Sequence, residues 1–411
     1  MFKIVRFPSK LNTFFCSLKS QFRYGHFDYF KILVLIIAMS WERRNIQALY
    51  RYLDSTSFPH RTRFNNFLHV GRWNPEEALA MKAYEMLKML NPKKGETLSL
   101  IIDDSKKGKR GKKMEAVGWL HDHVSGKSLW GHQYIKAMIS IRGYTIPFGI
   151  RLYVKKEDCH RLQVPFTKVT QLAAELIRAF QPPEGLNVIV LFDTYYLCPC
   201  VVNACRAKRF HFVSTLKANR NLFLHHRKVK AREWCSRLFK RTTKSTLRIR
   251  KEHGSAQYRY IDAGRRAVSK LGPLHLVVSR KNRERAMVLL VTDHPSLSAR
   301  RIITSYDTRW NIEVFFKDTK QLLGLGHYQN RPYTAAVTHL HLVCFAYALL
   351  THSAIERTCA QEKRLKKAHV SVRELQNDLR RVVWDDTAKY LQELPDEKHV
   401  FKELSRLLVA A

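Results

Sequence analysis

Acidic side chains and long apolar runs are both scarce in this sequence of 411 residues. The longest apolar candidate for a membrane span, residues 32–39, has eight residues, whereas a span needs about 20. The N-terminal residues contain no continuous apolar stretch with a small-residue cleavage site, so a secretory signal is not expected either. The sequence therefore predicts a protein without a membrane-spanning segment.

The spacings of a disulfide framework and of a zinc site are also missing. The eight cysteines are spread along the chain without the close, regular spacing of disulfide-rich proteins. Cys198, Cys200 and Cys205 lie near one another, but no CxxC pair or spaced histidines accompany them, as a zinc site requires. We therefore expect reduced thiols, no structural zinc and a location in the cytoplasm.

Positive charge is abundant. Lys and Arg number 73 against 34 Asp and Glu, which gives a net charge of +39 and a pI near 10.1. A folded protein tolerates this self-repulsion more easily when a polyanion screens it, and nucleic acid is the usual polyanion. RNA-associated proteins share this balance, so the charge indicates a class of partner but no reaction. Hydrophobic residues make up 45% of the chain, which is enough for a sizeable packed core.

Residues 26–92 have the apolar spacing of helices. Apolar positions recur every three or four residues through Phe30, Leu33 and Ile37, and another helix is expected over residues 75–90. Arginines lie among these helices: Arg43, Arg44, Arg51, Arg61, Arg63 and Arg72. We predict that this helical unit contacts DNA, the alternative being an ordinary solvated basic surface.

Two strand-like runs end in carboxylates. Residues 97–104 end in Asp103 and Asp104, and residues 187–192 are followed at once by Asp193. A continuous apolar run such as the second is typical of a strand buried on both faces. Further strands are expected at 129–141, 144–154 and 210–215, with a helix over 166–180. Strands mixed with helices predict an α/β layered core.

The segments after these strands complete the expected organisation. A basic, glycine-bearing loop at 106–113 is expected to contact phosphates, the alternative being a solvated charge run. Short alternating runs make residues 226–292 β-rich, and a helix is expected from Ser298 to Leu323, ended by Gly324. The predicted units are a helical region (1–94), the first part of the core (95–225), a β-rich insertion (226–292), the second part of the core (293–345) and a helical C-terminal region (346–411).

The helix near residue 310 places charged residues on one side. Tyr306, Arg309, Glu313 and Lys320 fall within roughly 60° of arc at about 100° per residue, beside the apolar face. A solvated polar stripe is the plain alternative. The two carboxylate-ended strands favour a site instead, because open α/β sheets bind ligands at the carboxyl ends of their strands.

Grouped carboxylates in a strongly basic protein indicate a metal site. Carboxylates that lie together raise one another's pKa unless a cation holds them. Hard oxygen ligands of this kind suit Mg²⁺ or Mn²⁺. Two such ions about 3.5–4 Å apart can activate a water or a 3′-hydroxyl and stabilise the leaving oxygen at phosphorus. The sequence therefore predicts phosphoryl transfer on DNA.

These residues resemble a known family. The pattern Tyr306-x2-Arg309-x3-Glu313-x6-Lys320 is similar to the YREK signature of bacterial insertion-sequence DDE transposases of the insertion-sequence-four type. The blocks around the two strand-end carboxylates look like the first and second acidic blocks of that family. The resemblance covers about residues 95–335 and implies a ribonuclease-H-like catalytic core with a β-rich insertion, flanked by helical regions.

The resemblance also implies which carboxylates hold the metal. Asp104, Asp193 and Glu313 would be the catalytic and metal-binding residues, with Mg²⁺ as the cofactor and Mn²⁺ able to substitute. Asp104 is preferred to Asp103 because the corresponding family residue precedes Ser or Thr. The alternation of side chains along the strand does not decide between Asp103 and Asp104 as the metal ligand.

Five residues near the Glu-bearing helix would bind DNA by the same resemblance. Four of them would lie against DNA: Tyr306, Arg309, Lys317 and Lys320. The three that belong to the signature, Tyr306, Arg309 and Lys320, would contact phosphates near the cleaved end. Trp310 stands where similar enzymes stack an indole on a base flipped from the duplex, and a core or surface tryptophan is the alternative. Whether the excised end forms a hairpin depends on this residue.

The implied function is transposition. Metal-dependent hydrolysis at the element ends would be followed by attack of the liberated 3′-hydroxyl on target DNA, without a covalent protein intermediate. The partners would be double-stranded DNA of the terminal repeats and the target, with a dimer when two ends are synapsed, in the bacterial cytoplasm at the nucleoid. The alternatives are a catalytically inactive DNA-binding remnant and a stand-alone metal-dependent nuclease.

Overall fold

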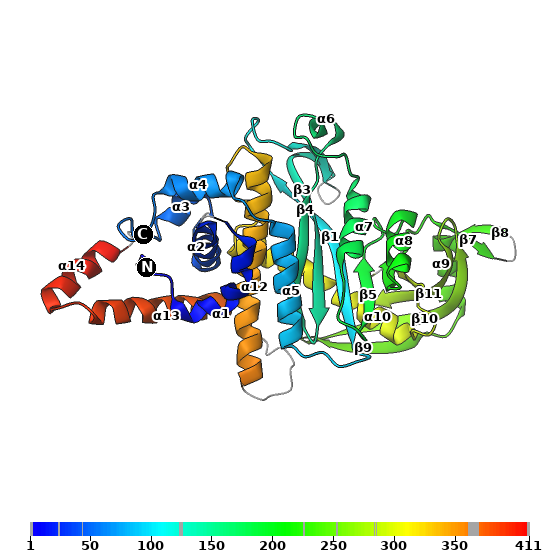
Figure 1. The fold of residues 1–411 in the computed structure, drawn as a ribbon. Coiled ribbons are helices and arrows are strands. Elements are labelled where there is room, and N and C mark those ends of the chain that lie inside the picture. The colour runs from blue at the N-terminus through cyan, green and yellow to red at the C-terminus, as the bar shows by residue number, and fades with distance from the viewer. Residues whose placement is uncertain are drawn as a thin grey trace.

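The computed structural model describes residues 3–23, 25–42, 44–122, 126–224, 227–251, 254–282, 284, 286–360 and 370–408. Within these residues twelve strands join in one mixed sheet, with helices packed beside it (Figure 1). The strands are β1 (Thr97–Gly108), β2 (Gly118–Asp122), β3 (Lys127–Ile141), β4 (Tyr144–Leu152), β5 (Asn187–Phe192), β6 (His211–Thr215), β7 (Asn221–Leu224), β8 (Arg227–Lys230), β9 (Ser245–Lys251), β10 (Gly254–Val268), β11 (Gly272–Lys281) and β12 (Val288–Thr292). The α/β class expected from the sequence is confirmed.

The helices gather at the two ends of the chain and between the strands. They are α1 (Asn12–Phe15), α2 (His26–Met39), α3 (Ile46–Tyr50), α4 (Arg61–Val70), α5 (Pro75–Met89), α6 (Lys156–Cys159), α7 (Val169–Ala179), α8 (Pro199–Ala207), α9 (Ala231–Arg241), α10 (Ala299–Thr308), α11 (Trp310–Leu322), α12 (Tyr333–Ala360), α13 (Val372–Gln392) and α14 (Glu397–Leu407). Two short 3₁₀ helices, η1 (Ser9–Leu11) and η2 (Cys16–Gln21), precede α2. The two ends of the described chain meet, because the Lys3 amide donates to the Leu407 carbonyl at 2.7 Å.

The sheet runs in the order β2-β3-β1-β5-β6-β12-β11-β10-β7-β8, with β4 beside β3 and β9 beside β10. Strands β1, β5 and β6 are parallel, and their neighbours on either side are antiparallel. The strands of the expected β-rich insertion continue this same sheet, because β12 pairs with β6. The insertion also contains α9, which the β-rich interpretation missed because charged residues separate its buried Ala231, Cys235 and Phe239.

A single long helix, α12, forms the centre of the hydrophobic core. It packs against α2, α4, α5 and β4. It is long and apolar enough to cross a membrane, but 89% of its most apolar stretch is buried inside the protein, as in a core helix. Residues 346–360 of this helix lie in the region expected to be helical, but its burial was not expected, because threonines and histidines such as His339 and His352 interrupt its apolar residues. The boundary expected between residues 345 and 346 falls inside it.

Not every arginine of the N-terminal helices faces solvent. Arg51, Arg61, Arg63 and Arg72 are exposed. Arg44 is buried, and its guanidinium donates to the carbonyls of Glu42, Ser40 and Leu322, so it joins the N-terminal region to the end of α11. Arg44 is therefore not part of the solvent-facing basic surface of this region, and Arg43 lies outside the described residues.

The packing of α12 predicts a large loss of stability when one ring is removed. Phe345 is fully buried, and its ring centroid lies 4.8 Å from that of Phe30. We expect Phe345→Ala to lower the free energy of unfolding by about 3–5 kcal/mol, because it leaves a cavity in the core. Phe401→Ala is the matched control: that ring is 73% exposed and its loss should change stability by less than about 0.5 kcal/mol. Guanidinium denaturation measures both, and equal effects would contradict a core shared by α12 and the N-terminal helices.

Candidate active site

The register of two parallel strands brings two carboxylates to one sheet edge. Strand β1 pairs with β5 from Thr97 opposite Asn187 to Ile101 opposite Leu191. Asp103 lies two positions beyond the last of these pairs in β1, and Asp193 comes directly after β5, so both lie at this edge. Because side chains alternate along a strand, Asp103 faces one side of the sheet and the next residue, Asp104, faces the other.

The hydrogen bonds of the two aspartates show these opposite directions. The Asp103 carboxylate accepts from the Arg309 guanidinium at 2.8 Å. The Asp104 carboxylate instead accepts from the Gln133 amide at 2.7 Å and the Tyr196 hydroxyl at 2.8 Å. Sequence reasoning did not single out Gln133 or Tyr196, because their proximity to Asp104 depends on strand pairing and on the turn after β5.

The charged residues near position 310 lie over the face that Asp103 occupies. Arg309 also donates to Glu313, one turn later in α11. Two turns beyond, the Lys320 ammonium donates to the Ser105 hydroxyl at 2.6 Å, and Ser105 shares the face of Asp103. Helix α11 therefore crosses β1 with its charged side against these residues.

The helix that carries these residues is interrupted, unlike the continuous helix expected over residues 298–323. Helix α10 ends at Thr308 and α11 begins at Trp310, and Arg309 caps both. Its backbone N–H donates to the Tyr306 carbonyl, and its own carbonyl accepts from Ile312, so the chain tightens there into i→i+3 bonds. The Tyr306 hydroxyl points to Thr215, 3.4 Å away, at the end of β6.

Burial and mutual repulsion weaken the acidity of the strand-end carboxyls. Burial is the main reason that the pKa of Asp103 is raised to about 7, and Asp193 and Asp104 add to the rise while Arg309 opposes it. Burial likewise raises the pKa of Asp193, with Asp104 adding and Arg309 opposing. Arg309 offsets only part of this rise, so a further cation at the site would favour the ionised forms of both carboxyls.

The donor set fits a hard divalent cation. Asp103, Asp193 and Glu313 offer carboxylate oxygens, the ligands that Mg²⁺ and Mn²⁺ prefer. Among the described residues, however, no group of three His, Cys, Asp or Glu side chains is arranged to hold a metal ion. The Arg309 guanidinium instead pairs with both Asp103 and Glu313.

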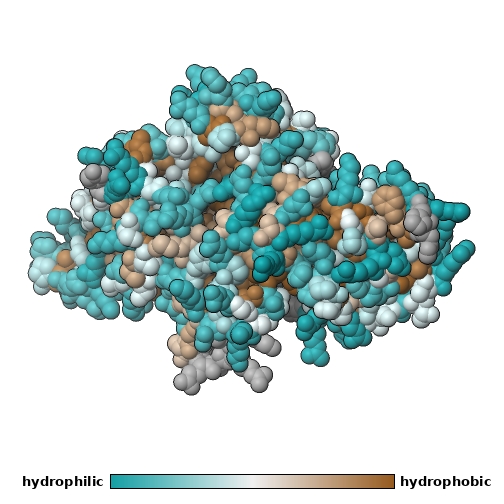
Figure 2. Space-filling view, turned by 45° about the vertical axis from the view of Figure 1, so that its right-hand side comes forward, coloured by the Kyte–Doolittle hydropathy of each residue, from teal (hydrophilic) through white to brown (hydrophobic). Residues whose placement is uncertain are grey.

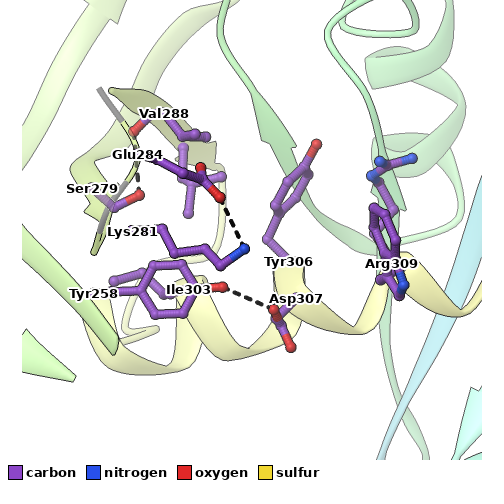
Figure 3. Close-up of a pocket in the computed structure, with 11 residues that line it drawn as sticks. Tyr258, Ser279, Lys281, Glu284, Val288, Ile303, Tyr306, Asp307 and Arg309 are labelled. Carbon is purple, nitrogen blue, oxygen red and sulfur yellow. Dashed lines mark hydrogen bonds and ion pairs between the residues drawn. The ribbon is translucent and has the colours of Figure 1, made fainter. Parts of the chain in front are cut away.

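Trp310 and Lys317 lie at the solvent side of this region. Trp310 is 58% exposed, so it is not a core tryptophan, and Lys317 is exposed as well. Trp310 lines a cavity of about 350 Å³ between α10 and strands β10 to β12. Figure 3 shows Tyr306 on α10 and Arg309 just after this helix, with Tyr258 bonded to Asp307 and Lys281 bonded to Glu284 beside them. The cavity therefore adjoins the group of carboxylates.

Comparison with known families agrees with this geometry. Residues 14–254, more than half of the chain, match the family described as DDE superfamily endonuclease. Residues 167–349 match the family described as transposase DDE domain. No curated protein matches the chain. The chain therefore belongs to the DDE superfamily of endonucleases, and its residues 167–349 are similar to a transposase DDE domain.

Proposed function

We propose that this protein is a transposase that cuts DNA at the ends of an insertion sequence and joins the cut ends to target DNA. The observations that support the proposal are the ion pairs of Arg309 with Asp103 and Glu313, and the position of Asp193 directly after β5, the parallel neighbour of β1. The proposal includes a ribonuclease-H-like core, membership of the insertion-sequence-four type and action in the bacterial cytoplasm at the nucleoid. A dimer would form when two ends are synapsed.

Asp103, Asp193 and Glu313 are the proposed ligands of Mg²⁺, for which Mn²⁺ would substitute. The bound ions would supply Lewis-acid activation of the attacking oxygen and stabilisation of the leaving oxygen. Resemblance to the family favours Asp104 as the first ligand. The side-chain directions favour Asp103, because Asp103 shares Arg309 with Glu313 whereas Asp104 bonds Gln133 and Tyr196.

The cationic residues of the site would position the DNA. Arg309, released from the carboxylates, and Lys320 can each donate to a phosphate oxygen, and Tyr306 can donate through its hydroxyl. Lys317 would add charge at the solvent side, and Trp310 would stack on an unpaired base beside the cavity. Hydrophilic residues cover most of the face shown in Figure 2, with hydrophobic residues in small separate groups, as suits a protein of net charge +39 that binds a polyanion.

Cleavage of a plasmid that carries both DNA ends flanking this gene tests the proposal. In Mg²⁺ or Mn²⁺ the native chain should nick at the ends and join them to a second plasmid, and excess EDTA should abolish both products. Tight binding without nicking would identify an inactive remnant. Nicking of single ends without joining would identify a metal-dependent nuclease.

A further inference from the structure

A basic groove lies beyond the carboxylates along β1. It has a volume of about 650 Å³ and lies between the end of β1 with its following loop and the segment after α11. Six cationic side chains line it: Lys107, Lys109, Arg110, Lys112, Lys113 and Arg331. No acidic side chain of the described residues lines it. The basic loop expected at 106–113 is thus partly strand, since β1 continues to Gly108.

Lys109 fixes the two walls of the groove to each other. Its ammonium donates to the carbonyls of Gly326 and Tyr328 at 2.8 and 2.9 Å, and it lies 3.3 Å from the centre of the Tyr328 ring. Burial lowers the pKa of Lys109 to about 7, which suits a structural role. Arg110, Lys112 and Lys113 are exposed and remain available to an anion.

A second hollow, lined by amides, adjoins the basic groove. Its volume is about 270 Å³. Gln329 lines both hollows. The other amides around it are Asn45, Gln47, Asn65 and Asn330. The Asn330 amide donates to Asn65 at 2.7 Å, which joins the segment after α11 to helix α4.

The exposed face of helix α4 carries basic and uncharged polar side chains. Phe64, Phe67 and Leu68 anchor its inner side in the core. Arg61, Thr62, Arg63, Asn65 and Asn66 are exposed, and the helix contains no acidic residue. Arginine donates to guanine edges in the major groove, asparagine pairs with adenine edges, and threonine contacts thymine methyl groups.

We propose that the basic groove and α4 together hold the duplex next to the cut site: the groove binds its phosphates and α4 reads its bases in the major groove. This rests on the proposed function, because it names where that function's DNA lies. Five residue-to-residue steps along β1 lead from Asp103 to Gly108, about 17 Å at about 3.3 Å per step. That length matches about five base-pair steps of 3.4 Å.

The test uses the full chain, without cleavage, in EDTA. The native protein is allowed to select from 30-base-pair duplexes of randomised sequence, and affinities are then measured for the enriched duplex and a scrambled one. Asn65→Ala/Asn66→Ala should weaken binding to the enriched duplex by about 10- to 100-fold, and binding to the scrambled duplex by less than about twofold. Asn66→Ala alone, which leaves the Asn65–Asn330 bond intact, should lose part of the preference in the same way.

The groove is tested through salt dependence. Arg110→Gln/Lys112→Gln/Lys113→Gln should weaken both duplexes alike and reduce the slope of log affinity against log salt by about 2.7, at about 0.9 per charge. Lys389→Gln/Lys398→Gln/Lys402→Gln, on exposed residues of α13 and α14, is the matched control and should leave the slope unchanged. Three outcomes would overturn the proposal: the selection enriches no sequence, the α4 variants lose equal affinity for both duplexes, or the groove variant keeps the native salt slope. None of these results depends on cutting, so they are distinguishable from failure of the proposed function.

Discussion

Asp103→Asn is expected to lower the rate of end cleavage at least about 10³-fold, or about 4 kcal/mol of transition-state stabilisation. Asp104→Asn should lower it by less than about tenfold, or about 1.4 kcal/mol. The two residues are neighbours with the same side chain, so each variant is the matched control for the other. Rates are measured on the plasmid with both ends, at saturating Mg²⁺.

The difference follows from the direction of each side chain. Asp103 lies at the same sheet edge as Asp193, just beyond the paired part of β1 and β5, and shares Arg309 with Glu313. Asp104 bonds Gln133 and Tyr196 on the other face, and an asparagine there keeps the size of the group and one of its acceptor oxygens. Asp104 contributes to the site mainly through its charge, which raises the pKa of Asp193.

The opposite ranking is equally informative. If Asp104→Asn abolishes cleavage and Asp103→Asn does not, the assignment taken from the family resemblance holds and β1 must turn in the DNA-bound state. Thermal melting of both variants without metal distinguishes catalysis from folding. Asp103→Asn removes a largely buried partner of Arg309, so some loss of stability is expected there, and cleavage must be compared at a temperature where both variants are folded.

Much of the fold could be predicted from apolar patterning. The run at 187–192 coincides with β5, and the run at 97–104 identified the start of β1, because buried parallel strands leave continuous apolar sequences. The helix at 75–90 was also recognisable, since Asn74 caps it and Pro75 begins it. The burial of helix α12 could not be predicted, because its threonines and histidines lie within the protein, a property that local sequence does not express.

The site could be predicted only as a set of residues. Charge and spacing identified Glu313 and the cations around it, but the choice between Asp103 and Asp104 depends on strand register, which is set by partners about 90 positions away. The break at Arg309 is a tertiary effect too, since Arg309 reaches Asp103 from the junction of two helices. Only the pairing of β1 with β5 makes these side chains neighbours.

Glu313→Gln should separate cutting from binding. We expect end cleavage to fall at least about 10³-fold, because an amide cannot replace the charge that a divalent cation needs. DNA binding should become tighter, because the variant removes one negative charge near the phosphates and weakens the hold on Arg309. One charge pair at about 4 Å in water is worth about 1 kcal/mol, so the gain should be about fivefold. Fluorescence anisotropy with a duplex of the element end measures the affinity.

Asp307→Asn provides the matched control on the neighbouring helix. It removes the same charge a short distance away, where Asp307 accepts from the Tyr258 hydroxyl. It should tighten DNA binding by no more than Glu313→Gln does and should leave cleavage within about tenfold of the native rate. Equal loss of cleavage in both variants would show that the effect is one of local charge and not of Glu313. Weaker DNA binding by Glu313→Gln would show instead that the Arg309–Glu313 ion pair is needed for the DNA-binding conformation. It would contradict the proposal that Arg309 leaves the carboxylates and donates to a phosphate.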